Sequence, residues 1–236
     1  EGTQRQIRKA KISPMKIKKI LITHWHGDHV LGLPGLMQTL ARGDYSNTLE
    51  IYGPKNTKKF IEKMFSFFTP INEKIKYKVI EIQKVGVFFE NDWFKLESIK
   101  VDHNTETLAY SIIEKDKIRI KKDFLEKKQI GSGPHMKKLQ EGKDIVYKGE
   151  KIKAKEATFK EKGKKVSIVM DTRVCKEAVK IAKDADLFIC EATLLEDLKD
   201  MAKEYHHLTA KQAAEIAKKA KVKKLVLTHI SQRYKD

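Results

Sequence analysis

Short runs of β-branched, aliphatic and aromatic residues recur along the first half of the chain and predict β-strands. One of them, residues 16–23, alternates lysine with isoleucine and then continues as an apolar run up to a predicted loop. Residues 57–68 differ, because their apolar side chains recur at helical spacing and predict an amphipathic helix. The other strands predicted in this half are residues 49–52, 76–82, 93–101 and 108–114.

The second half alternates predicted strands with predicted helices. Residues 166–170 form a continuous apolar run, which is typical of a buried strand. Thr209 precedes an amphipathic segment and suits the N-cap of a helix. Predicted strands dominate the first half, and predicted strands alternate with helices in the second half. A mixed α/β protein is therefore predicted. The other elements predicted here are strands at 187–190 and 225–227 and helices at 176–183, 193–205 and 209–219.

The composition fits a folded protein of one large domain, or of a domain with a small appendage. Hydrophobic residues make up 40% of the 236 residues, enough to fill a core. No apolar run approaches the ~18–20 residues that span a bilayer, and no signal-peptide pattern opens the chain, so no membrane segment is expected. Two isolated cysteines, Cys175 and Cys190, suit a reducing cytoplasm and argue against a disulfide framework.

The chain is strongly basic. It has 50 Lys or Arg against 32 Asp or Glu, a net charge of +18. Such a charge favours a polyanionic partner, although lysine enrichment for solubility or heat tolerance would also produce it. Residues 115–165 alone carry 18 basic and 8 acidic residues, a net charge of +10. Their centre is punctuated by Gly and Pro and looks poor in core residues, which predicts a projecting, mobile excursion; an ordinary solvated face is the alternative.

Three of the eight histidines fall within six residues, directly after the predicted strand at 16–23. His24, His26, Asp28 and His29 form an HxHxDH cluster. His24 and His26 point the same way from an extended backbone, so both rings can reach one cation. Gly27 lets the chain turn, and Asp28 and His29 then face a second position. Imidazole and carboxylate ligands suit Zn²⁺, with Mn²⁺ or Fe²⁺ as substitutes.

Two metals need more ligands than this cluster supplies. His103, Asp171 and His229 each follow a predicted apolar strand, where a layered β-rich fold would gather its loops on one edge. Taken singly, each is also compatible with a capping or core residue. Taken together after the HxHxDH cluster, they supply the missing ligands. A metal pair about 3.5–4 Å apart suits in-line displacement at phosphorus.

These residues belong to longer motifs that resemble a known enzyme family. Over nearly its whole length the chain resembles ribonuclease Z, the tRNA 3′-end endonuclease of the metallo-β-lactamase superfamily. The resemblance implies an αββα fold over residues 1–236, with two sheets face to face and helices outside. It rests on residues 24–29 (HWHGDH), 32–35 (GLPG), His103, 171–173 (DTR), 191–193 (EAT), 207–209 (HLT) and 228–234 (THISQRY).

The resemblance also implies a role for each residue of the site. Asp28 would accept a hydrogen bond from the nucleophile. His207, rather than its neighbour His206, would donate a proton or a hydrogen bond to the scissile phosphate or leaving oxygen, and Glu191 would hold its ring. A plain helix-terminal neighbour of Thr209 is the alternative for His207. The implied ligands are His24, His26 and His103 for one zinc and Asp28, His29 and His229 for the other, with Asp171 bridging both.

The basic excursion resembles the arm with which members of this family grip the tRNA elbow. The resembling part is residues 118–148, in which Pro134-His135-Met136-Lys137 replaces the usual apolar stretch. Lysine-rich arms bind phosphates without reading bases and recognise folded shape. The candidate contacts in this arm are Lys121, Lys122, Lys127, Lys128, Lys137 and Lys138.

The expected protein is therefore a zinc-dependent endoribonuclease that removes the 3′ trailer from precursor tRNA and leaves a 3′-hydroxyl. By resemblance it is a homodimer, and about forty residues with further strands would precede residue 1. One alternative is a small-ester or thioester hydrolase of the glyoxalase II type, which shares every metal ligand but needs neither the basic arm nor the Glu191 and His207 motifs. Another is an RNA-binding protein with structural zinc, whose sites would be closed and four-coordinate.

Overall fold

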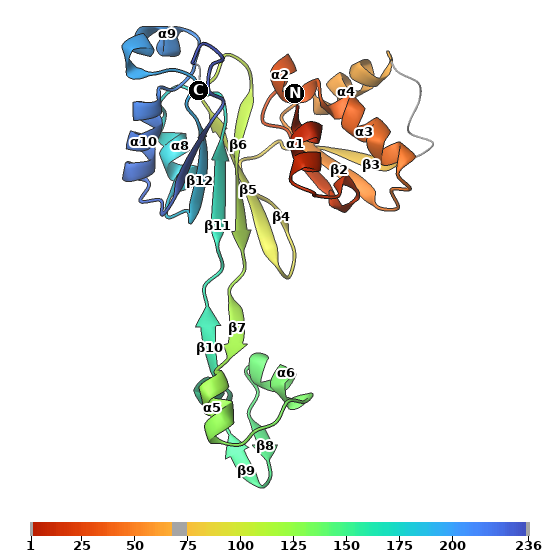
Figure 1. Cartoon of the computed structure of the whole chain (residues 1–236), viewed down its shortest axis with the longest axis vertical. Coiled ribbons are helices and arrows are strands. Elements are labelled where there is room, and N and C mark those ends of the chain that lie inside the picture. The colour runs from red at the N-terminus through yellow and green to blue at the C-terminus, as the bar shows by residue number, and fades with distance from the viewer. Residues whose placement is uncertain (1, 68–74, 235–236) are drawn as a thin grey trace. The chain divides into compact units, whose positions relative to one another are not determined.

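The computed structural model describes residues 2–67 and 75–234, and the chain divides into two compact units (Figure 1). The larger unit comprises Glu1–Glu90, Lys95–Ile112 and Lys165–Asp236, and the smaller comprises Asn91–Phe94 and Ile113–Lys164. Among the described residues, no helix is both long and apolar enough to cross a membrane.

The larger unit contains two β-sheets. Its strands are β1 (Lys19–Leu21), β2 (Thr48–Gly53), β3 (Lys76–Glu81), β4 (Gly86–Glu90), β5 (Phe94–Val101), β6 (Thr107–Glu114), β11 (Lys165–Val169), β12 (Leu187–Glu191) and β13 (Leu225–Thr228). The first sheet has the order β1-β2-β3 with parallel neighbours, and the second has the order β13-β12-β11-β6-β5-β4. Within the second sheet β11, β12 and β13 are parallel, so their carboxyl ends lie at one edge.

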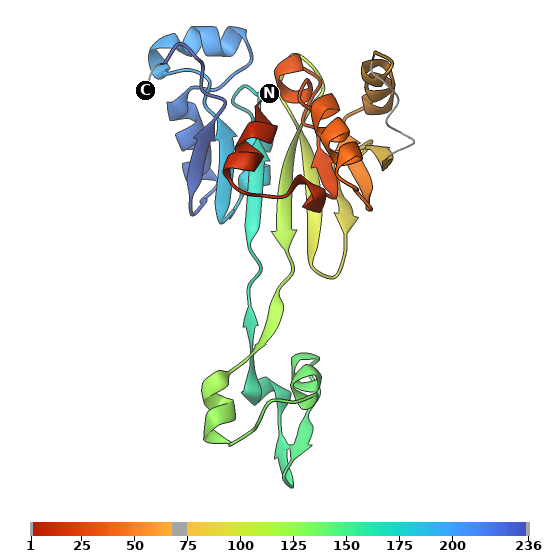
Figure 2. The same cartoon turned by 45° about the vertical axis from the view of Figure 1, so that its right-hand side comes forward.

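The predicted αββα fold is confirmed. Three apolar clusters hold the two sheets against each other and each sheet against the helices that cover it. Leu49 and Ile51 of β2 pack with helices α3 (Leu33–Arg42) and α4 (Thr57–Phe65). Tyr52, the next residue in β2, faces the opposite way and packs with Tyr110 of the second sheet. This alternation buries both faces of β2. The far face of the second sheet packs on helices α8 (Lys176–Ala182) and α10 (Ala210–Lys219), as Figure 2 shows.

Several predicted elements differ from the structure. The predicted strand at 16–23 shrinks to β1, because Pro14–Lys16 forms a 3₁₀ turn. The predicted helix at 193–205 is wrong at its start: Leu194 forms a bridge with Thr209, so the chain turns only at Glu196–Leu198 and continues as α9 (Lys199–Glu204). The helix predicted at 57–68 ends at Phe65, and residue 68 lies outside the described residues.

The first half is also less dominated by strands than predicted. It contains the unpredicted helices α1 (Thr3–Lys9), α2 (Gly27–Val30) and α3, together with the unpredicted strand β4. Gly27 has no positive φ and simply begins α2, so the turn in the HxHxDH cluster does not depend on glycine's conformational freedom. Thr209 caps α10 as predicted, in a capping box with Gln212.

The smaller unit has a core of its own, so the prediction of an excursion poor in core residues is wrong. Ile130, which stands in the centre predicted to be poor in core residues, is buried in this core together with Leu139, Ile145 and Ile152. The unit also extends beyond the predicted arm at 118–148. Its elements are β7 (Lys117–Ile120), α5 (Lys122–Lys127), α6 (His135–Gln140), β8 (Ile145–Tyr147), β9 (Glu150–Ile152), α7 (Ala154–Ala157) and β10 (Thr158–Glu161), with β7 antiparallel to β10 and β8 to β9.

Candidate metal centre

The edge formed by the carboxyl ends of the parallel strands carries the chemically reactive residues. Asp171 lies two residues beyond β11, Glu191 ends β12, and His229 directly follows β13. The carboxyl ends of parallel strands commonly place functional groups side by side in this way. His103, two residues beyond β5, and the HxHxDH cluster after β1 meet them there.

The first group of donor atoms consists of three imidazoles and one carboxylate. His24 Nε2 is 3.1 Å from His26 Nδ1, and His103 Nε2 is 3.2 Å from the same atom. Asp171 Oδ2 lies 3.5 Å from His24 Nε2 and 3.8 Å from His103 Nε2. Because the carbonyl of His206 can only accept, the 3.1 Å contact with His103 Nδ1 places a proton on Nδ1 and leaves Nε2 as a ligand atom.

The second group shares Asp171 with the first. Asp171 Oδ2 is also 3.3 Å from His29 Nε2, and its other oxygen, Oδ1, is 3.4 Å from His229 Nε2. Asp28 Oδ2 lies 3.1 Å from His29 Nε2 and 3.2 Å from His229 Nε2. The seven side chains thus form two four-donor groups joined by one buried carboxylate.

These distances fit bound metal ions. A tetrahedral ion with bonds of about 2.0–2.2 Å keeps neighbouring ligand atoms about 3.3–3.6 Å apart. The contacts above lie at or near that spacing. His29 Nε2 and Asp171 Oδ1 are buried without a hydrogen bond, which costs free energy unless a cation lies beside them. The clustered nitrogens and carboxylate oxygens therefore suit two cations better than a hydrogen-bond network among themselves.

Burial and mutual charge tune most of these groups for metal binding. Burial, reinforced by the nearby His29, lowers the pKa of His24 to about 3, and burial also lowers the pKa of His103, so both rings favour the neutral form, in which an imidazole can bind a metal. Burial would raise the pKa of Asp171, but His29 and His229 hold it far below its usual range. The pKa of His29 is raised, because Asp171 outweighs burial, so a proton competes with a cation for its Nε2.

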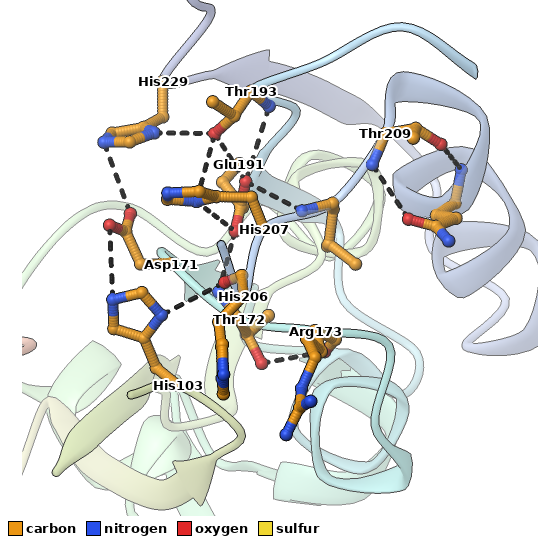
Figure 3. A network of polar contacts seen from close by, with 12 residues as sticks. His103, Asp171, Thr172, Arg173, Glu191, Thr193, His206, His207, Thr209 and His229 are labelled. Carbon is orange, nitrogen blue, oxygen red and sulfur yellow. Dashed lines mark hydrogen bonds and ion pairs between the residues drawn. The ribbon is translucent and has the colours of Figure 1, made fainter. Parts of the chain in front are cut away.

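Beside the two groups lies a network centred on the fully buried Glu191 (Figure 3). Its Oε1 accepts a hydrogen bond from Thr172 N at 2.7 Å and lies 3.2 Å from His207 Nδ1. Its Oε2 accepts from Leu208 N at 3.1 Å. Burial alone would lower the pKa of His207, but Glu191 raises it and favours the protonated ring. Glu191, His207 and His229 also lie close enough to hold a metal, but the hydrogen bonds of Glu191 already occupy both its oxygens.

The structure therefore brings all seven sequence-predicted ligands together, with Glu191 and His207 alongside. Their roles as ligands and catalytic groups stay predictions. His207 and not His206 faces Glu191, while His206 contributes its backbone carbonyl to His103. The candidate lysines lie elsewhere, in the smaller unit, where Lys128 is paired with Glu150. The other five are Lys121, which precedes α5, Lys122 and Lys127 within α5, and Lys137 and Lys138 within α6.

Sequence reasoning missed two supporting contacts. Arg173 donates to both carboxylate oxygens of Asp102 at 3.1 Å, which joins the loop of Asp171 to the loop of His103. The hydroxyl of Thr193 contacts Glu191 and His229. Arg173 and Thr193 belong to the quoted motifs, and Asp102 directly precedes His103. No local pattern indicates these contacts, because Arg173 is 71 residues from Asp102 and Thr193 is 36 residues from His229.

Comparison with known proteins points to one family. Residues 1–109 match the family model of the metallo-beta-lactamase superfamily. Ribonuclease Z of Nanoarchaeum equitans is 41% identical over 234 residues, covering 99% of this chain and 73% of that protein. Ribonuclease Z of Bacillus cereus is 38% identical over 237 residues, covering 99% and 77%. The crystal structure of human tRNase Z, short form, superposes with a TM-score of 0.70 at 29% identity, covering 99% of this chain and 80% of that one. With this fold and these identities over nearly its full length, the chain belongs to the ribonuclease Z family.

Proposed function

We propose that this chain is a metal-dependent endoribonuclease that hydrolyses a phosphodiester at the 3′ end of precursor tRNA, removing the 3′ trailer and leaving a 3′-hydroxyl. The observation that carries the proposal is the pair of donor groups sharing Asp171 beside the Glu191–His207 pair. Family membership supports the substrate, because the printed names of the relatives describe ribonucleases and a tRNase.

Two Zn²⁺ ions are proposed as the cofactors, with Mn²⁺ or Fe²⁺ as substitutes, since the donors are imidazole and carboxylate. When bound, such a pair supplies Lewis acidity at the phosphoryl oxygen and lowers the pKa of water. The first group would hold one ion and the second the other. Their residues are His24, His26 and His103 for the first, Asp28, His29 and His229 for the second, and Asp171 for both.

Protein groups would handle the protons. The Asp28 side chain is 61% exposed, so it can reach an attacking water while also facing His29 and His229. Its carboxylate would accept a hydrogen bond from that water. His207 would donate a proton to the leaving oxygen, with Glu191 fixing its ring through Nδ1 so that Nε2 faces the substrate. The raised pKa of His207 suits a proton donor at neutral pH.

The smaller unit is proposed to bind tRNA through phosphate contacts. This unit contains the six candidate lysines, and its apolar core makes it a folded module rather than a loose segment. Lys128 is the weakest of the six candidates, because Glu150 already neutralises it. We further propose that the protein is a homodimer and works in the cytoplasm, where the unpaired Cys175 and Cys190 would stay reduced.

The function is tested by comparing substrates on the whole chain. Zinc-loaded protein is expected to cut a precursor tRNA at one site and to hydrolyse bis-p-nitrophenyl phosphate slowly, while small esters and thioesters react weakly. Gel analysis of the RNA product gives the cleavage position. Strong thioester turnover with intact precursor tRNA would instead identify a glyoxalase II-type hydrolase. Tight tRNA binding with no cleavage of any substrate would identify a binding protein.

Removal of the smaller unit should separate tRNA binding from chemistry. Lys117 pairs with Glu161 across the β7–β10 ladder, so residues 118–160 can be replaced by Asn-Gly, which favours a two-residue hairpin turn. The KM for precursor tRNA is expected to rise on the order of tenfold or more, because phosphate contacts are lost while every residue of the metal centre is kept. Hydrolysis of bis-p-nitrophenyl phosphate should stay near the intact rate, as steady-state kinetics would show. Equal loss of both activities would mean that the unit is structural.

A further inference from the structure

Thr193 lies at the point where the second donor group meets the Glu191–His207 pair (Figure 3). Its Oγ1 is 2.7 Å from Glu191 Oε2, 2.8 Å from His229 Nδ1 and 3.3 Å from His207 Nδ1. It immediately precedes Leu194, whose backbone bridges to Thr209, so this loop has a fixed path. One hydroxyl thus contacts a candidate metal ligand and both members of the candidate proton-transfer pair.

The possible donors and acceptors decide where the protons lie. Glu191 accepts from three backbone N–H groups, those of Thr172, Thr193 and Leu208, as a carboxylate does, so it can only accept from the hydroxyl of Thr193 as well. The single hydroxyl proton of Thr193 therefore points at Glu191. The hydroxyl oxygen must then accept from His229, whose Nδ1 carries a hydrogen.

This assignment leaves Nε2 of His229 with its lone pair facing the second donor group. That nitrogen lies 3.2 Å from Asp28 Oδ2 and 3.4 Å from Asp171 Oδ1. A lone pair that faces two carboxylate oxygens needs a cation or a proton among them. Thr193 thus selects the ring nitrogen of His229 that presents itself to a metal, as second-sphere partners of zinc-bound histidines generally do.

The backbone around His229 reinforces this arrangement. His229 has a φ of 57°, in the left-handed region that side chains other than glycine enter at a steric cost. Backbone hydrogen bonds hold the strained turn on both sides: Ser231 N donates to Thr193 O at 3.0 Å, and Ala192 N donates to Thr228 O at 2.9 Å. Thr193 therefore secures the ring of His229 through its side chain and the turn through its carbonyl.

We propose that Thr193 is a positioning residue that orients His229 for the second metal and couples that metal position to Glu191 and His207. The inference rests on the metal centre of the proposed function, but not on its RNA substrate. In the described part of the chain, no hydrogen bond joins Thr193 to His24, His26 or His103. Removing its hydroxyl should therefore weaken one metal position and spare the other.

The test is zinc binding by the whole chain, measured by equilibrium dialysis and elemental analysis without RNA. Thr193→Val removes the hydroxyl at nearly constant volume, and Thr193→Ser restores it. Thr209→Val is the matched control, because the hydroxyl of Thr209 likewise donates to a glutamate and accepts a second hydrogen bond, yet its partners are Glu196 and Gln212. Thermal unfolding followed by circular dichroism identifies any variant that does not fold.

Thr193→Val is expected to bind one zinc as tightly as the wild type and the other about 10–100-fold more weakly, the usual effect of losing a second-sphere partner. Thr193→Ser should recover most of that affinity. Thr209→Val should lose stability but bind both ions normally.

The inference would be overturned if Thr193→Val bound both ions with full affinity, or if the valine and serine variants lost the same zinc affinity. It would also be overturned if the wild type bound fewer than two ions. If Thr193→Val keeps both ions while the wild type cuts precursor tRNA, only the inference fails. If Thr193→Val loses one ion but precursor tRNA stays intact in every assay, only the function fails.

Discussion

Asp171→Asn should release both metal ions. Because the proposed chemistry depends on these ions, kcat for precursor tRNA should fall by at least about 10⁴-fold. Asp171 is the one residue common to both donor groups, and its two oxygens face different imidazoles. The amide keeps the shape but removes the charge and one acceptor. Among the described residues, no other carboxylate belongs to both groups and could replace it.

Metal content and activity must be measured together for this prediction. Elemental analysis should show less than one bound ion per chain, and hydrolysis of bis-p-nitrophenyl phosphate should fall in parallel with tRNA cleavage. Asp186→Asn is the control, because Asp186 directly precedes β12 of the same sheet and accepts a hydrogen bond from Lys165 N, but lies outside both donor groups. Asp171→Asn protein that retains two ions would contradict the shared-ligand assignment.

His207→Ala should lower kcat for precursor tRNA by roughly 10²–10⁴-fold, the range expected for loss of a general acid. Both metals should remain bound, because His207 belongs to neither of the two groups that share Asp171. The KM should change little, since the proposed proton transfer develops only in the transition state. Single-turnover cleavage of labelled precursor tRNA, with zinc content measured on the same sample, separates these effects.

The neighbouring histidine provides the control for His207. His206 has a φ of 59°, and Asn tolerates this left-handed conformation, so His206→Asn preserves the carbonyl that holds His103. Its kcat should stay within a few-fold of the wild type, because the proposed roles of His206 use its backbone alone. A larger loss in His206→Asn than in His207→Ala would exchange the roles of the two residues.

The sequence alone predicted most strands of the larger unit, because the alternation and continuity of apolar residues reflect which faces are buried. β2, with Leu49 and Ile51 on one face and Tyr52 on the other, is an example. Helix α3 was missed because its predictive features, GLPG and a short apolar stretch, were interpreted as part of a motif. The helix expected from residue 193 failed because Leu194 pairs with Thr209, a tertiary contact that overrides local propensity.

In the smaller unit, Ile130 begins a stretch punctuated by Gly and Pro, so the sequence predicts few core residues at residues 130–138. Ile130 is nevertheless buried with Leu139, Ile145 and Ile152, because α6, β8 and β9 fold back on one another and bring residues of separate elements into one cluster. Burial depends on that closure and not on local composition, so this core could not be predicted from a window of sequence.

The sequence by itself determined the chemical types of the site: five imidazoles and two carboxylates at strand ends, with a second histidine–carboxylate pair in the motifs at 191–193 and 207–209. Local residue identity limits which ligands are available, so these could be identified without coordinates. Only the tertiary structure decided that Asp171 uses a separate oxygen for His29 and for His229, that Arg173 joins Asp102, and that Thr193 contacts His229. Such contacts depend on the parallel register of β11, β12 and β13, which brings the loops after these strands to one edge of the sheet. Hydrogen bonds between loops that are far apart in the sequence leave no local sequence pattern, so the sequence alone could not predict them.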